Sequence, residues 1–131
     1  MSEDKNQKPD ISNAEFEVLD ALWDDYPATS ADIIARLNSR KAWHEKTIKT
    51  LLSRLVKKQV ISFEKLQRQY LYTPLIARED YTKKETASFV SRMFKGKIAP
   101  MVAGFANQNS LSRQDVDELK ALIEKWEKNN D

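Results

Sequence analysis

The chain has 131 residues, enough for one compact domain, or a small domain with an extension, but not for two independent cores. It contains no cysteine, which excludes disulfides, thiol catalysis and thiolate metal sites. Only two glycines and four prolines occur, which favours helices over a turn-rich all-β fold. The net charge of +2 is small, so the distribution of charge is more informative than its total.

The charges fall into three segments. Residues 1–35 carry nine acidic and two basic residues, residues 36–70 carry ten basic and two acidic ones, and residues 71–131 are nearly balanced. A concentrated basic segment in a nearly neutral chain is typical of a polyanion-binding surface. The alternative is that the acidic first segment folds against the basic one and neutralises it.

The first ten residues, MSEDKNQKPD, are polar, and we expect them to form a disordered tail. They contain no apolar signal-peptide core. No apolar run approaches the roughly 18 residues that cross a bilayer. We therefore expect a cytoplasmic protein with no membrane association.

Two short helices are predicted after the tail. Ser12 and Glu15 have the spacing of a capping box, so the first helix should begin at Ser12. The residue before Pro27 avoids the α region, which should end this helix. Thr29 and Asp32 repeat the capping pattern and open a second helix that ends near residue 38. Apolar residues at helical spacing follow each cap: Phe16, Leu19, Leu22 and Trp23 in the first helix, and Ile33, Ile34 and Leu37 in the second.

A third helix is predicted over residues 46–58, KTIKTLLSRLVKK, and its residues divide into two arcs. At about 100° per residue, the apolar arc that should face the core consists of Ile48, Leu51, Leu52 and Leu55. The opposite arc consists of Lys46, Thr47, Lys49, Thr50, Ser53, Arg54 and Lys57. No acidic residue occurs in this stretch, although a solvated face usually mixes both charge signs. Threonine, lysine and arginine contact phosphates and base edges in a DNA major groove, so we predict that this arc binds DNA. The alternative is a charged surface helix with incidental threonines.

A β-hairpin is predicted next. β-branched and aromatic residues at 60–63 and 70–72 flank a polar four-residue turn, LQRQ, and Pro74 closes the second strand. Three helices followed by a hairpin is the order of a winged helix-turn-helix. We therefore predict a winged-helix domain over residues 11–75.

Residues 76–131 are predicted to form a helical dimerisation domain. A helix over about 77–95 is interrupted by Gly96 and Pro100, and a last helix begins with the capping pattern of Ser112 and Asp115. A heptad-like seam suitable for pairing with another chain consists of Val116, Leu119, Ile123 and Trp126. Phe89 and Met93 of the earlier helix are assigned to the same interface. The chain as a whole is thus expected to be mainly α with a small β-hairpin.

These segments resemble the penicillinase repressor family (BlaI/MecI/CopY). The resemblance lies in ISNAEFEVLDALW, in the WxxKTIKTLLSRLVKK block and its following VI, and in QYLYTPLI. It continues through KKETASFVSRMFKGKIAPMVAGF and LSRQDVDELKALIEK, and so covers about residues 11–127.

The resemblance implies a transcriptional repressor that is a homodimer and binds an inverted-repeat operator in double-stranded DNA. Matching positions imply recognition-helix contacts by Lys46, Thr47, Thr50 and Arg54, and a wing contact by Arg68. Lys49, Lys57 and Trp43 are further candidate DNA contacts. In a dimer, the two recognition helices should meet successive major grooves about 34–36 Å apart.

The chain departs from the family pattern at both ends of the third helix. His44 stands where the family often has serine, and histidine is a weaker N-cap. Gln59 stands where the family usually has glycine, and glutamine would be strained in the left-handed conformation or would avoid it.

The mode of regulation is open at this point. In β-lactam-responsive members the repressor is cleaved at an Asn-Phe bond, and the corresponding pair here is Gly104-Phe105. The copper-responsive branch uses a C-terminal cysteine motif, which this chain lacks. The resemblance also points to a membrane metalloprotease sensor as a possible upstream partner.

No enzyme is expected, because the sequence has no Gly-rich phosphate loop, HExxH motif or nucleophile elbow. His44 is the only histidine, so neither a metal site nor a cofactor is expected. Trp23, Trp43 and Trp126 are expected to be packing anchors, with Trp43 bordering the recognition helix. Two alternatives remain: a winged helix that docks an acidic protein partner, and a ligand-sensing regulator with a pocket at the dimer junction.

Overall fold

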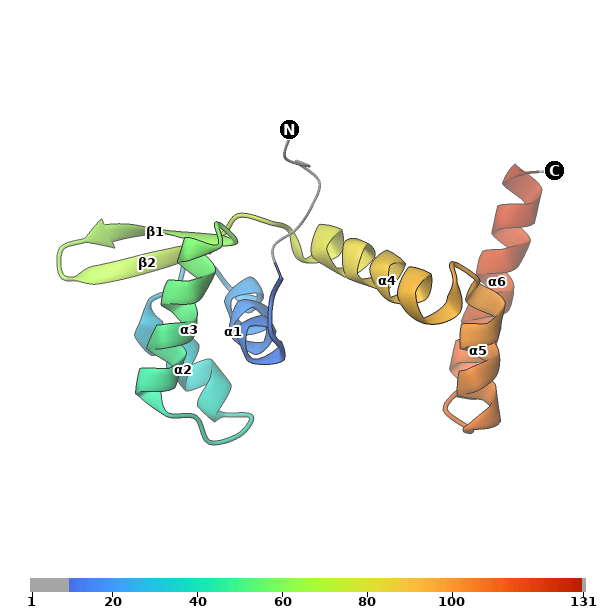
Figure 1. The fold of residues 1–131 in the computed structure, drawn as a ribbon, viewed down its shortest axis with the longest axis horizontal. Helices are drawn as coiled ribbons and strands as arrows, with labels where there is room; N and C mark the ends of the chain where they lie inside the picture. The colour runs from blue at the N-terminus through green and yellow to red at the C-terminus, as the bar shows by residue number, and fades with distance from the viewer. Residues whose placement is uncertain (1–9, 131) are drawn as a thin grey trace. The chain divides into compact units, whose positions relative to one another are not determined.

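The computed structural model describes residues 10–130, so most of the expected N-terminal tail lies outside the described residues. The chain forms two compact units that divide between Thr82 and Lys83. The first unit contains α1 (Asn13–Asp24), α2 (Ser30–Asn38), α3 (Glu45–Lys57), β1 (Ile61–Leu66), β2 (Gln69–Pro74) and the first turn of α4 (Arg78–Phe94) (Figure 1). The second contains the rest of α4, α5 (Ile98–Asn107) and α6 (Arg113–Asn129). The predicted fold class, mainly helical with one antiparallel hairpin, is confirmed.

The core of the first unit lies between α1, α2 and α3, because each helix turns an apolar stripe toward the other two. On α3 the buried residues are Ile48, Leu51, Leu52 and Leu55, as the arc analysis predicts. Fully buried partners on the other helices include Val18, Leu19, Leu22, Ile33 and Leu37. Side chains of this kind contribute about 1.5–3 kcal/mol each on burial. This packing therefore fixes the orientation of α3 and determines which of its faces is exposed.

The predicted helix starts are confirmed by their caps. Ser12 Oγ accepts from the Glu15 N–H at 3.1 Å, and Glu15 Oε1 accepts from the Ser12 N–H at 2.8 Å. Thr29 and Asp32 form the same reciprocal pair at the start of α2, and Ser112 and Asp115 form it at the start of α6. Each box satisfies two backbone donors that have no partner inside the helix.

The hairpin is longer than predicted, and its turn is shorter. The strands pair from Ile61 with Pro74 to Leu66 with Gln69, which leaves a turn of two residues, Gln67 and Arg68, instead of four. Gln67 takes a left-handed φ of 59°, which a two-residue hairpin turn requires. The true strand ends could not be predicted from the sequence, because the residues near the tip are exposed on both faces and hydrophobic alternation does not mark where the strands end.

The base of the hairpin is tied to the segment before α2. The Ala28 N–H donates to Tyr72 O at 3.0 Å, and the Tyr72 N–H donates to Ala28 O at 2.7 Å. This antiparallel bridge joins the hairpin to the residue just before the N-cap of α2. The wing and the start of α2 therefore have fixed positions relative to each other.

Both ends of α3 show the consequences of the unusual residues there. The helix begins at Glu45, and the N-cap residue His44 makes no side-chain hydrogen bond to it. At the other end the Val60 N–H donates to Leu55 O at 3.0 Å and the Gln59 N–H donates to Val56 O at 2.9 Å, the two bonds of a Schellman motif. Gln59 adopts the left-handed conformation with a φ of 61°, which costs a non-glycine residue about 1–2 kcal/mol.

The start of α4 belongs to the packing of the first unit. The Trp23 Nε1–H donates to Ile76 O at 2.9 Å, and Tyr81 is buried with its ring stacked on Phe16 at 5.7 Å between centroids. The Arg78 guanidinium lies 5.4 Å from the centroid of the Trp23 ring. The chain just beyond residue 75 is thus anchored on α1.

The second unit has little interior of its own. No residue of α5 or α6 is buried, and on α4 beyond Thr82 only Val90 is. Within the described part of the chain, no helix is both long enough and apolar enough to span a membrane.

Glu15 is the one buried charged residue among those described, and it holds Lys58 at the end of α3. Lys58 Nζ lies 2.7 Å from Glu15 Oε1, and it also donates to the backbone oxygen of Asp10. Burial by itself would raise the pKa of Glu15. The hydrogen bond and charge of Lys58 and the bonds from Ser12 outweigh it, and the pKa is lowered below its ordinary value.

We predict that Glu15→Gln lowers the free energy of unfolding at pH 7 by about 1–3 kcal/mol, because Lys58 and the Ser12 N–H lose a charged acceptor. The pKa of Glu15 is lower in the folded than in the unfolded protein, so ionised Glu15 stabilises the fold above its unfolded pKa. That contribution is lost as the pH falls through the folded pKa. Urea unfolding of both proteins between pH 7 and pH 3 should show the difference shrinking toward acid, and a constant difference would contradict the assignment.

Candidate nucleic-acid interface

The outer face of α3, defined by the seven residues of the predicted polar arc, is exposed along its whole length. The exposed residues are Lys46, Thr47, Lys49, Thr50, Ser53, Arg54 and Lys57. The only acid in the helix, Glu45, occupies its first position, where a negative charge favours the helix dipole. The outer face itself carries four cations and no carboxylate.

The acidic residues of α1 are paired with other basic residues. Arg40 contacts Asp24 at 2.8 Å and Asp20 at 3.3 Å, and Lys41 contacts Glu17 at 3.3 Å. Arg78 reaches the same two aspartates at 3.0 and 3.1 Å. Pairs this exposed contribute little stability each, but they determine which cations have a nearby counter-charge.

The basic residues at 36–70 therefore fall into two sets, those paired with acids and those that are not. Four of the ten basic residues at 36–70 are paired with acids of the first segment, namely Arg36, Arg40, Lys41 and Lys58. Among residues 10–130, no ion pair involves Lys46, Lys49, Arg54 or Lys57. The neutralisation alternative thus describes one part of the basic segment, and the outer face of α3 keeps an uncompensated positive potential.

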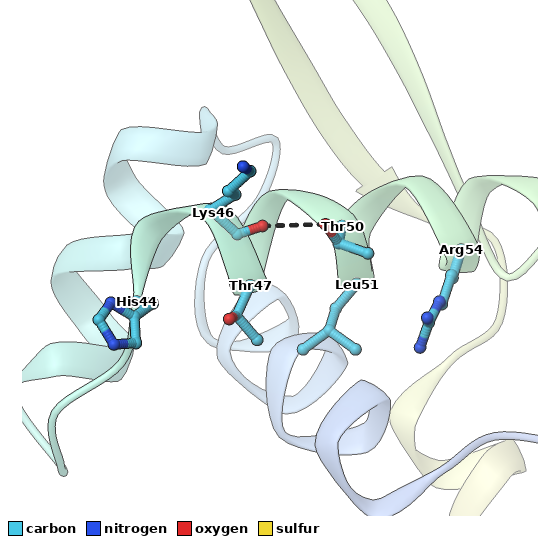
Figure 2. Close-up of a pocket in the computed structure, with 6 residues that line it drawn as sticks. All are labelled: His44, Lys46, Thr47, Thr50, Leu51 and Arg54. Atoms are coloured by element: carbon cyan, nitrogen blue, oxygen red, sulfur yellow. Dashed lines mark hydrogen bonds between the residues drawn. The ribbon is translucent and has the colours of Figure 1, made fainter.

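One side of this face surrounds an open hollow of about 440 Å³ (Figure 2). Its lining consists of His44, Lys46, Thr47, Thr50, Leu51 and Arg54. The Thr50 hydroxyl donates to Lys46 O at 3.0 Å. Thr50 therefore presents its oxygen lone pairs and its methyl group to a ligand, rather than a free donor.

The wing residue Arg68 lies in the two-residue turn and is exposed. It lines a second hollow together with Lys49 of α3, so these two predicted contacts lie at one corner of the unit. Trp43, in contrast, is half-buried and packs against the core. Lys41 Nζ sits 5.0 Å from the centroid of the Trp43 ring, and the buried Nε1 of Trp43 has no hydrogen-bond partner among the described residues.

The residues assigned to dimerisation lie on the second unit and include its most exposed apolar side chains. Trp126 is 64 % exposed, Met93 60 % and Ile123 56 %; Phe89 is also exposed, while Val116 and Leu119 are half-buried. Periodicity missed further exposed apolar residues of the same unit: Ile98, Phe105 and Leu122.

Gly104 and Phe105, the pair that the resemblance aligns with a cleaved bond, lie inside α5 and are exposed. The described residues contain no cluster of three histidine, cysteine, aspartate or glutamate side chains that could hold a metal ion.

Comparisons with known proteins agree with this geometry. A family model described as the penicillinase repressor matches residues 11–125. The penicillinase repressor of Bacillus licheniformis is 34% identical over 116 residues, which cover 88% of this chain and 91% of that protein. The methicillin resistance regulatory protein MecI of Staphylococcus aureus strain N315 is 32% identical over 120 residues, covering 92% and 98%.

Two solved structures resemble part of the chain. The DNA-binding domain of the repressor BlaI matches with a TM-score of 0.52 and 37% identity, covering 57% of this chain and 92% of that one. The B. licheniformis BlaI monomer in complex with the blaP half-operator matches with a TM-score of 0.50 and the same identity and coverage. From the matched model and these relatives, the chain belongs to the penicillinase repressor family.

Proposed function

We propose that this protein is a sequence-specific DNA-binding repressor of transcription, which acts in the cytoplasm as a homodimer on an inverted-repeat operator. Its role is binding rather than catalysis. The observation that carries the proposal is the outer face of α3, an exposed surface with two threonines, no carboxylate and four cations that form no ion pair among residues 10–130. The relatives support it, since one is a penicillinase repressor and another was solved with a half-operator.

The proposed division of labour on α3 follows from side-chain chemistry. Lys46, Thr47, Thr50 and Arg54 surround one hollow, which runs from the first turn of α3 to Arg54 in its third turn. They are assigned to base edges, which the N-terminal part of a recognition helix contacts. The methyl group of Thr50 suits a thymine methyl, and Arg54 suits a guanine edge. Lys49 and Lys57, with Arg68 on the wing, are assigned to phosphates, and half-buried Trp43 supports the start of the helix.

The exposed apolar surface of the second unit supports the homodimer. A unit with almost no interior and several large exposed apolar side chains needs a partner to cover them. Residues 76–131 are proposed to form the dimer through Phe89, Met93, Val116, Leu119, Ile123 and Trp126. A hollow of about 420 Å³ between α5 and α6, lined in part by Leu119 and Leu122, continues this surface and is assigned to the second copy.

Release from DNA is proposed to follow loss of the dimer. A membrane metalloprotease sensor acting at Gly104-Phe105 would have to unfold α5 locally, because proteases bind extended backbone and this pair is helical. Cleavage there would cut the second unit between α4 and α6.

We predict that selection from random duplex DNA enriches an inverted repeat that the protein binds at least about 10³-fold more tightly than a scrambled duplex.

Thr50→Ala should weaken binding to the selected site by about 1 kcal/mol, roughly fivefold, and leave scrambled DNA unaffected. Lys57→Ala should weaken both and reduce the slope of log affinity against log salt by about 1 per protomer. Fluorescence anisotropy across a salt series measures all three. Equal, weak binding of selected and scrambled duplexes would refute the proposal.

We predict that Ile123→Asp dissociates the dimer, because a carboxylate would be buried in the apolar interface. The dimer dissociation constant should rise at least about 30-fold, or about 2 kcal/mol, as measured by sedimentation velocity. Lys125→Asp, a charge change on the same helix off the seam, is the control and should remain dimeric. An Ile123 variant that sediments as the parent does would show that the seam lies elsewhere.

A further inference from the structure

The corner between the wing and α3 forms an open hollow of about 350 Å³. Three elements line it: the start of α2 with Thr29 and Ser30, α3 with Lys49 and Ser53, and the hairpin with Arg68 and Tyr70. None of its lining residues is acidic. The hollow thus collects side chains from separate parts of the chain around one uncompensated positive region.

Two features of the lining suit an anion with several oxygen atoms. Lys49 and Arg68 form no ion pair within residues 10–130. Their like charges repel each other across the hollow, and an anion bound between them would offset this repulsion. The hydroxyls of Ser53 and Tyr70 make no hydrogen bond within the described part of the chain, so both can donate to a ligand.

The hollow is also held in shape. Tyr72, on its wall, exchanges two backbone hydrogen bonds with Ala28, and its ring lies at 6.5 Å from that of Tyr70 between centroids. Burial raises the pKa of Tyr72, and the neighbouring Tyr70 adds to the rise. A tyrosine is neutral at pH 7 even at its ordinary pKa, so Tyr72 brings no negative charge to the wall.

We infer that this hollow binds a single backbone phosphate of the DNA, held jointly by Lys49 of α3 and Arg68 of the wing. The inference rests on the proposed function and deepens it: the recognition helix and the wing grip one phosphate rather than two separate ones. The planar guanidinium fork matches two phosphate oxygens, and the lysine ammonium supplies a second positive charge. The shared phosphate fixes the angle at which α3 enters the groove.

A double-mutant cycle on the full-length protein tests this, with Lys49→Ala, Arg68→Ala and both together, on the selected site and on scrambled duplex. One shared phosphate predicts that the double variant lowers the salt slope by about 1 per protomer, and that the two effects couple by at least about threefold. The control pair is Lys57→Ala with Arg68→Ala, because Lys57 is also assigned to a phosphate but does not line this hollow. This pair should lower the slope by about 2 per protomer, with effects that multiply.

Two separate phosphates would make the Lys49 pair behave as the control pair does, and this result would overturn the inference. Single variants that bind scrambled DNA as tightly as the parent would overturn it as well. Neither result touches the proposed function, which fails only if the parent does not distinguish its selected site from scrambled DNA. Thermal unfolding of each variant checks that these exposed substitutions leave the fold intact.

Discussion

The surface chemistry of this protein depends on how the carboxylates of α1 are used. Glu15 is buried against Lys58 at the end of α3, while Asp20 and Asp24 hold Arg40 and Arg78. The α1 acids Glu15, Glu17, Asp20 and Asp24 are therefore occupied by basic residues that lie outside the outer face of α3. Because they are occupied in this way, the outer face of α3 keeps its positive charge.

The same pairs also position the helix that carries this charge. Lys58 joins the end of α3 to the capped start of α1, and the apolar arc of α3 fixes its rotation. The residues at the two ends of α3 stabilise the helix poorly, since His44 provides no cap bond and Gln59 occupies a left-handed position. Tertiary contacts thus determine the position of α3 more than its own terminal residues do, as is usual for a short helix.

Much of the fold follows from local rules that the sequence displays directly. The capping boxes at Ser12, Thr29 and Ser112 and the two arcs of α3 depend only on residue spacing, and the structure has them as predicted. The two-residue turn did not follow, because residues near the hairpin tip are exposed on both faces. The sequence left two outcomes open for Gln59, strain in the left-handed conformation or avoidance of that conformation, and the structure shows the strained one.

The interface could be predicted only in part. Spacing alone placed Lys46, Thr47, Thr50 and Arg54 on one exposed face. Which cations would be neutralised depends on contacts between residues far apart in sequence, such as Arg40 with Asp24, so no spacing rule shows it. The hollow shared by α3 and the wing likewise depends on long-range contacts such as the Ala28–Tyr72 bridge, which joins the hairpin to the segment before α2.

DNA is proposed to bind the cations that α1 leaves unpaired. Titrating the ¹⁵N-labelled protein with its selected duplex and mapping amide shift changes tests it most directly. We expect the largest changes within residues 44–57 and 67–72, with small changes at Arg40, Lys41 and the acids of α1. A map centred on Arg40 and Lys41, with α3 unmoved, would contradict it.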